Sequence, residues 1–214
     1  MLLICLFGPD GSGKSTLAKA LAYFLKRKEL RVMISWMRGT HTLASILARL
    51  LSKFRTFQGP CNPYYHICIP PSLKTLWIWV EFYSMLPILF LRFLLPKALG
   101  YLVVAERGLI DFLVWITITT RQPRVLTSII GRFTMALARK TSTNIYIRAD
   151  LKTLQKRRPT SPEASSLSIQ LKIYDAIAKA FEIPTVDTSN ISVAESIKQI
   201  LEQVALRLSL EKRV

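Results

Sequence analysis

The chain has 214 residues, of which 50% are hydrophobic, so it can form one domain with a sizeable core and is not a disordered chain. Its 30 lysines and arginines against 13 acids give a net charge of +17, which favours polyanionic partners. Three cysteines, an odd number, and an apolar N-terminus without a basic lead-in indicate a reducing, cytoplasmic environment.

The first stretch joins an apolar strand, residues 2–7, to a helix over residues 15–28 through a glycine-rich turn. The turn reads Gly8-Pro-Asp-Gly-Ser-Gly-Lys-Ser15, the phosphate-binding P-loop pattern in its strand–turn–helix context. Glycines permit positive φ, so backbone N–H groups can converge on phosphate oxygens, and the start of the helix adds its dipole. Lys14 would reach the β- and γ-phosphates and Ser15 would bind magnesium. We predict that the chain binds a nucleoside triphosphate.

The next stretch is predicted to be a strand over residues 31–36 and an amphipathic helix over residues 42–54. Residues 56–72 contain Gly59, Pro60, Pro63, Pro70 and Pro71 and should form an exposed loop. Cys61, His66 and Cys68 lie in this loop, but their spacing matches no standard zinc site, so no metal site is predicted there.

Residues 73–95 are hydrophobic nearly all round. Glu81, Pro87 and Arg92 interrupt the stretch, and no run of eighteen uncharged residues exists, so we do not expect it to span a membrane. We expect a helix covered on one side by the core and on the other by a partner subunit or a lipid surface.

Strands and helices alternate through the rest of the chain. Strands are predicted over residues 101–105, 144–148 and 183–186, and helices over 109–120, 128–138, 151–158, 167–181 and 193–210, with a polar loop at 159–166. This alternation predicts a parallel sheet with helices on both faces and ligands at the carboxyl edge of the strands. The glycine-rich turn, Arg38 and the Glu106–Arg107 pair would all lie at that edge.

Three further stretches carry chemistry. Glu106 can hold the water shell of a metal or accept a proton, and Arg107 can clamp a phosphate, although a salt bridge at a strand end is the alternative. Arg157 and Arg158 precede a flexible segment and could close over a γ-phosphate, although a solvated helix end is the alternative. The Asp187–Asn190 turn is interpreted as a helix N-cap.

Cations are unevenly distributed along the chain. Glu81 is the only acid from residue 30 to 105, and residues 112–149 contain none. Basic and aromatic residues do not follow the pattern of a nucleic-acid module, so we favour nucleotides as the anionic partners. Nucleic acid and peripheral contact with an anionic membrane remain alternatives.

With these residues in view, nearly the whole chain resembles thymidylate kinase and the wider P-loop nucleoside-monophosphate kinase family. The likeness is carried by Phe7–Thr16, by Arg38-Gly-Thr40 with its following helix, and by the strand into Glu106–Arg107. The lid helix from Asp150 and the stretches Gln170–Tyr174 and Val186–Ser189 resemble the C-terminal third of the family.

The resemblance implies a three-layer P-loop NTPase sandwich, a five-stranded parallel sheet with helices on both faces. It also implies a single kinase domain over 1–214 with a small helical lid at about 151–167, usually dimeric. The implied catalytic residues are Lys14, Glu106, Arg107, Arg157 and Arg158. The implied ATP-binding residues are Gly8, Asp10, Gly11, Ser12, Gly13, Lys14, Ser15 and Thr16. Asp10, Arg38 and Arg107 would bind the acceptor, and Ser15 and Glu106 the metal.

We therefore expect a kinase that uses ATP and Mg²⁺ to phosphorylate a nucleoside monophosphate, with dTMP first, acting as a homodimer. The chain departs from the family pattern at Glu106, where the family has Asp, at Gly108, where it has Tyr, and after Arg38, where Glu-Pro-Gly is missing. Glu106–Arg107 with Asp111 also resembles deoxynucleoside kinases, whose acceptor carries no phosphate. A nucleoside or another non-nucleotide acceptor stays open, as does a P-loop protein that binds nucleic acid or an anionic membrane.

Overall fold

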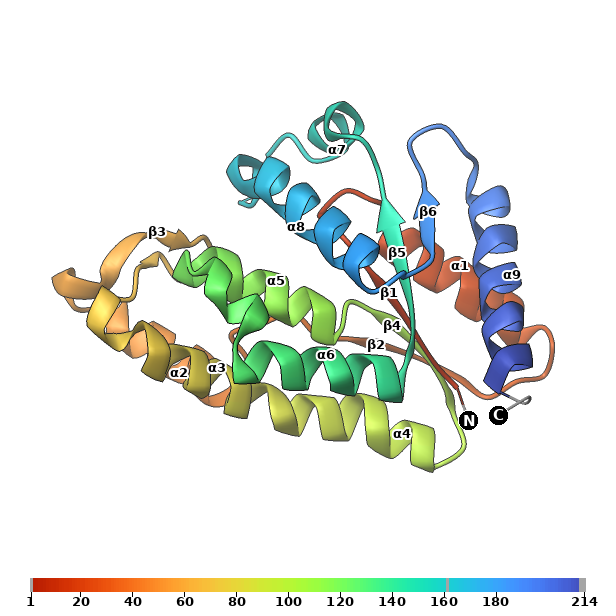
Figure 1. Cartoon of the computed structure of the whole chain (residues 1–214), viewed down its shortest axis with the longest axis horizontal. Helices are drawn as coiled ribbons and strands as arrows, with labels where there is room; N and C mark the ends of the chain where they lie inside the picture. The colour runs from red at the N-terminus through yellow and green to blue at the C-terminus, as the bar shows by residue number, and fades with distance from the viewer. Residues whose placement is uncertain (1, 161, 212–214) are drawn as a thin grey trace.

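The chain is an α/β protein built on a parallel sheet. The computed structural model describes residues 2–160 and 162–211 (Figure 1). The strands are β1 Leu3–Phe7, β2 Val32–Trp36, β3 Gln58–Asn62, β4 Leu102–Glu106, β5 Thr143–Arg148 and β6 Thr185–Asp187. Five of them form an all-parallel sheet in the order β2-β4-β1-β5-β6, which agrees with the predicted sheet.

Nine α-helices are found in the part of the chain that the structure describes. They are α1 Lys14–Lys26, α2 Thr42–Leu51, α3 Lys74–Leu89, α4 Leu95–Ala98, α5 Leu109–Thr120, α6 Ile129–Thr141, α7 Leu151–Arg157, α8 Leu167–Ala180 and α9 Val193–Glu211. The predicted helix over 109–120 has these same bounds in the structure, whereas the helix predicted over 42–54 ends at Leu51, where Ser52 begins a turn. Residue 161, inside the predicted 159–166 loop, lies outside the described residues.

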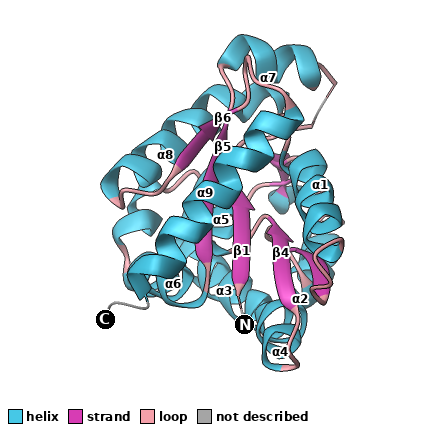
Figure 2. Cartoon of the chain, turned by 90° about the vertical axis from the view of Figure 1, so that its right-hand side faces the viewer, coloured by secondary structure: helices cyan, strands magenta, loops and turns pink. Residues whose placement is uncertain are grey.

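Each face of the sheet packs against its own set of helices. β1 lies in the centre of the sheet and all five of its side chains are buried, because helices cover both of its faces. One core packs apolar residues of α1 and α9 against the sheet, and a larger core packs α3, α5, α6 and α8 against the other face. Figures 1 and 2 show this arrangement of helices around the sheet.

The loop predicted over residues 56–72 contains structure that the sequence did not indicate. β3 forms antiparallel bridges to Ile67, and Cys61 and Cys68 form a disulfide across this hairpin-like turn, with their Cα atoms 4.9 Å apart. The odd cysteine count had indicated a reducing environment and did not predict this pair. Cys5 is a buried free thiol in β1.

The apolar stretch predicted over 73–95 is a longer helix than expected. α3 continues through a π-helical segment, Phe90–Leu94, into α4, and the π turn lies between Pro87 and Pro96, which lack the N–H that a regular helix requires. By length and composition alone, the continuous helix Pro71–Ala98 could cross a membrane, and 39% of its most apolar window is buried within the fold. Core helices of soluble proteins meet the same criterion.

Candidate functional site

The glycine-rich loop between β1 and α1 is a tight turn at the carboxyl edge of the sheet. Gly8, Gly11 and Gly13 have φ values of 146°, 87° and 91°, in the region that favours glycine. A Cβ at Gly8 would lie 2.2 Å from the carbonyl oxygen of Ile147, so β5 approaches too closely for any side chain there. These positions hold the loop against the sheet edge and direct it into α1.

Lys14 is the first residue of α1, and its side chain is buried within the loop. Its Nζ donates to the Pro9 carbonyl at 2.6 Å and to Ser12 Oγ at 3.3 Å. Burial, with help from the nearby Arg107 charge, lowers the pKa of Lys14 to about 7. An anion that bound beside this amine would restore its protonated form.

Ser15 and Glu106 bring a hydroxyl and a carboxylate together beside the loop. Ser15 follows Lys14 in α1, Glu106 ends β4, and Ser15 Oγ donates to Glu106 Oε1. Two neighbouring hard oxygen atoms suit Mg²⁺, which usually takes only one or two protein ligands and completes its octahedron with water and phosphate oxygens. No group of three or more His, Cys, Asp or Glu residues able to hold a metal occurs among the described residues. The site thus fits a Mg²⁺ ion brought in with a phosphate ligand.

Arg107 lies directly after β4 and is almost fully buried among carboxylates. Its backbone is left-handed, with φ 74°, and its guanidinium pairs with Asp10 and, at 3.5 Å, with Asp111 Oδ1. Burial acts to lower the pKa of Arg107, but Asp111 and Asp10 outweigh it, so the pKa lies above its ordinary value and the charge is fixed. Asp111 is held in turn by the Gly8 N–H at 3.3 Å and the Tyr174 hydroxyl at 2.8 Å.

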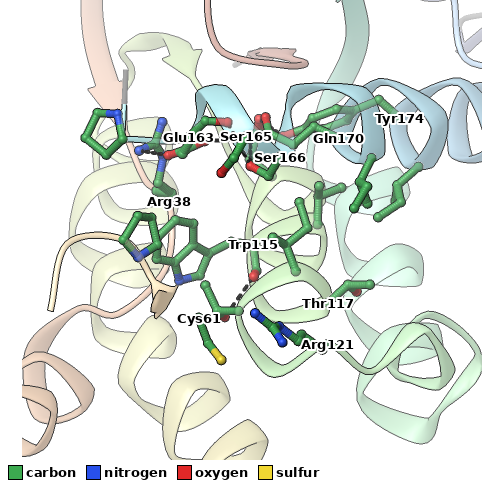
Figure 3. Close-up of a pocket in the computed structure, with 18 of the residues that line it drawn as sticks. Arg38, Cys61, Trp115, Thr117, Arg121, Glu163, Ser165, Ser166, Gln170 and Tyr174 are labelled. Atoms are coloured by element: carbon green, nitrogen blue, oxygen red, sulfur yellow. Dashed lines mark hydrogen bonds and ion pairs between the residues drawn. The ribbon is translucent and has the colours of Figure 1, made fainter. Parts of the chain in front are cut away.

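Arg38, from the loop after β2, points toward the same carboxylates. It forms ion pairs with Asp10 at 3.4 Å and with Glu163 at 2.5 Å, and it donates to the Tyr64 hydroxyl at 2.6 Å. The guanidinium carbon lies 5.5 Å from the Tyr64 ring centre and 5.7 Å from that of Trp115. Figure 3 shows Arg38 beside Glu163, with Trp115 below them. The prediction that Arg38 and Arg107 lie at one strand edge agrees with this geometry.

Thr40 anchors the Arg38 loop through a buried carboxylate on α3. The backbone N–H and hydroxyl of Thr40 donate to Glu81 at 2.5 and 2.6 Å, and its hydroxyl accepts from Trp115 Nε1 at 3.0 Å and from Asn62 Nδ2 at 3.3 Å. Burial raises the pKa of Glu81 to about 7, against the hydrogen bonds from Thr40, which favour the carboxylate. The position of the Arg38 loop therefore depends on a buried acid of α3.

Arg157, at the end of α7, reaches back over the glycine-rich loop. It donates to the Gly11 carbonyl at 3.3 Å, to Thr188 Oγ1 at 3.1 Å and to the Thr188 carbonyl at 2.8 Å. Thr188 Oγ1 also donates to the Ser12 carbonyl at 2.9 Å, so the turn after β6 contacts the loop directly. The Arg158 side chain packs beside Gly11.

Two cavities meet at Arg107. The first, of about 290 Å³, is lined by the glycine-rich loop, α1 and the α7 arginines. The second, of about 450 Å³, lies between α5 and α8 and has a mostly apolar lining that includes Arg38, Trp115 and Tyr174 (Figure 3). Lys14, Ser15, Glu106, Arg157 and Arg158 line the first cavity together, and Arg107 lines both.

The sequence indicated Asp10 as a site residue, but it did not indicate the Glu163 carboxylate or the Tyr64 hydroxyl, which also hold Arg38. Glu163 lies in a loop and Tyr64 in a turn, and neither has a recognisable local pattern. The N-cap of α9 is Ser192, which exchanges hydrogen bonds with Glu195, and not the Asp187 turn as predicted. Asp187 instead accepts from the Ser189 N–H at 2.9 Å, which fixes the turn that carries Thr188.

Comparison with known proteins does not assign a family. No protein-family model matches the chain, and a search of curated proteins finds no match. Function is therefore inferred from the chemistry of the two cavities.

Proposed function

We propose that this chain transfers the γ-phosphoryl group of ATP to a nucleoside monophosphate, with dTMP as the expected acceptor. One observation carries the proposal: a loop cavity suited to a triphosphate and a larger cavity suited to an organic acceptor share the guanidinium of Arg107. A kinase needs two ligands placed in line with a cation between them, because phosphoryl transfer is catalysed mainly by positioning and charge.

The donor nucleotide would occupy the cavity beside the glycine-rich loop. In this proposal the loop is a P-loop: the N–H groups from Gly11 to Thr16 and the start of α1 would surround the β- and γ-phosphates. Lys14 would leave the Pro9 carbonyl and bind these phosphates in its protonated form. Ser15 and Glu106 would hold Mg²⁺, which, when bound, supplies positive charge against the developing negative charge on the phosphate oxygens.

The acceptor would occupy the cavity between α5 and α8, with its phosphate toward Arg107 and Arg38. An oxygen of that phosphate would attack the γ-phosphorus, the bond to the β–γ bridging oxygen would break, and ADP would leave. Arg157 would turn from the Gly11 carbonyl to the γ-phosphate, so that α7 and its following loop act as a lid. Trp115 and Tyr174 offer aromatic surface for the base of the acceptor.

The test is turnover with purified protein, ATP, Mg²⁺ and each nucleoside monophosphate in turn. We expect ADP formation that depends on the acceptor and is fastest with dTMP, and Lys14→Ala should abolish it. Lys19→Ala is the matched control, because Lys19 is an exposed lysine one turn and a half along the same helix. Absence of turnover with every monophosphate, or full activity in Lys14→Ala, would refute the proposal.

A specific observation favours a second acceptor class. Arg38 and Arg107 form ion pairs with Asp10, Asp111 and Glu163. The place where the acceptor phosphate would bind therefore has three carboxylates for two arginines, and no net positive charge. An acceptor that presents a hydroxyl instead of a phosphate, a nucleoside or another alcohol, would need no extra positive charge there. A screen that compares thymidine with dTMP at equal concentration separates the two classes.

A further inference from the structure

The long helix made of α3, the π segment and α4 exposes an apolar stripe along its outer side. Its members are 36–63% exposed: Leu76, Trp79, Tyr83, Phe90, Leu91, Leu95 and Leu99. Successive members lie three, four or seven residues apart, except Phe90 and Leu91, which are adjacent in the π segment. Residues at this spacing share one face of a helix, and the 28-residue helix has a length of about 42 Å. The stripe itself contains no charged side chain.

Neighbouring elements extend this apolar surface. α2 is joined to α3 by the Ala44 N–H, which donates to Ser84 Oγ at 2.9 Å, and it exposes three aliphatic residues, Leu43, Ile46 and Leu50. On the other side of α3, Phe133 of α6 packs edge-on against Phe82 and is itself half exposed. Edge strand β2 exposes Met33 on the sheet face that α3 covers, and Arg92 of the π segment donates to the Trp36 carbonyl. We call this combined surface the α3 face; Figures 1 and 2 both show α3 and α4 on the opposite side of the molecule from α7.

The charge on the α3 face has one sign. Residues 30–105, which form β2, α2, α3 and α4, contain eight lysines and arginines and a single acid, Glu81. Glu81 is buried and bound to Thr40, so it does not contribute to the surface. Residues 112–149, which include α6, contain six lysines and arginines and no acid. Arg38 and Arg148 are not part of this surface, because Arg38 pairs with Asp10 and Glu163 and Arg148 pairs with Asp175 and Asp187. The remaining cations of these segments are not balanced by any exposed carboxylate from the same segments.

We propose that the α3 face docks on the surface of an anionic phospholipid bilayer. Hydrocarbon would take up the apolar stripe, and the lipid phosphates would pair with the surrounding cations, which is how interfacial helices with basic borders bind membranes. Exposed Trp79, Tyr83 and Tyr101 are residues of the kind that lie at the headgroup level. A second copy of the chain is a poorer occupant, because a symmetric pair would bring cation-bordered faces together with no carboxylate between them.

The helix lies in the plane of the bilayer in this proposal and does not cross it. Its inner side, including Ile78, Met85 and Phe93, belongs to the larger core, and Glu81 on the same side holds the Arg38 loop. Insertion across the membrane would remove these side chains from the core. The docking proposal rests on the surface alone and is independent of the proposed kinase activity.

The test is co-sedimentation of the full chain with vesicles of phosphatidylcholine alone and of phosphatidylcholine with phosphatidylglycerol. We expect binding to the anionic vesicles only, and a loss of about tenfold when salt is raised from about 0.05 M to about 0.5 M, which screens the cations. The double variant Tyr83→Glu, Leu91→Glu should lose at least about tenfold in binding. The matched control Tyr23→Glu, Phe24→Glu changes the charge equally at two exposed residues of α1 and should bind as the native chain does.

A second measurement uses the native chain and needs no variant. Bromine-labelled lipid should quench the emission of the exposed Trp79, while Trp77 and Trp115 are buried and should contribute unquenched emission. Absence of binding and of quenching at low salt would overturn the proposal. The proposal would also be refuted if the native chain formed a dimer, the Tyr83→Glu, Leu91→Glu variant were a monomer, and neither protein bound vesicles. In that case the α3 face would be a subunit interface.

Discussion

Raising the pH above 7 should weaken nucleotide binding through Lys14. The Lys14 amine is buried beside Arg107 and has a pKa of about 7 in the structure. A bound triphosphate needs the protonated amine and would raise its pKa, so binding above pH 7 must take up a proton. The affinity is therefore full below pH 7 and falls as the pH rises through that value.

The magnitude follows from the fraction of Lys14 that is neutral. With a pKa of about 7, the apparent Kd increases by the factor 1 + 10^(pH − 7), which is about 1.1 at pH 6 and about 11 at pH 8, a loss of about 1.4 kcal/mol between them. Proton uptake should approach about 0.1 per nucleotide at pH 6 and about 0.9 at pH 8 by the same titration.

Calorimetry with a non-hydrolysable ATP analogue and saturating Mg²⁺ measures the apparent Kd and the proton uptake. Each pH is examined in two buffers of different ionisation enthalpy, because the difference in heat gives the number of protons taken up. Lys14→Arg is the control, because arginine stays charged over the whole range and should give a flat profile. Glu81 also titrates near pH 7, so Glu81→Gln should keep the native slope. An affinity that does not change from pH 6 to 8, or a slope that survives in Lys14→Arg, would refute the reasoning.

Three further predictions follow from the same geometry. Burial raises the pKa of Glu81 from 4.5 to about 7, so the folded state loses stability as the pH rises between these values. Between pH 5 and pH 8 the free energy of unfolding, measured in urea, should fall by about 2–3 kcal/mol more in the native chain than in Glu81→Gln. Equal losses in the two proteins would contradict the burial argument. Arg157→Met should lower kcat by about 10³-fold or more, while Lys156→Met, an exposed neighbour, should leave it unchanged; a native kcat in Arg157→Met would remove this arginine from the transition state. Ser15→Ala should raise the Mg²⁺ concentration for half-maximal activity by about tenfold, and an unchanged Mg²⁺ titration would show that the Ser15 hydroxyl is not a ligand.

Much of the fold could be predicted because its signals are local. The five consecutive apolar residues of β1 indicate a strand buried on both faces, and the structure places β1 at the centre of the sheet. The glycines at positions 8, 11 and 13 indicate a turn with positive φ, and all three adopt it. Periodicity also predicts α5 with its observed bounds, although β-branched residues crowd its end.

The parts that could not be predicted depend on contacts between distant segments. β3 has glycine and proline at its centre, and what makes it a strand is its pairing with Ile67. The Cys61–Cys68 disulfide likewise depends on the turn that brings the two residues together, and counting cysteines could not reveal it. Tyr64, at the tip of this turn, reaches both Arg38 and Glu163, a contact without any counterpart in local sequence.

The partners of the cations matter most for function, because they set the net charge that a ligand meets. The sequence predicted Arg38 and Arg107 as phosphate clamps, but in the structure they share Asp10, and Glu163 from the loop between α7 and α8 forms an ion pair with Arg38. A phosphate can bind the terminal nitrogens of both guanidinium groups only after it displaces these carboxylates. Binding of a monophosphate must therefore be coupled to movement of the segment that carries Glu163. A hydroxyl acceptor could enter while every ion pair stays intact. The choice between the two acceptor classes is therefore a question of whether the Arg38–Glu163 pair opens when the acceptor binds.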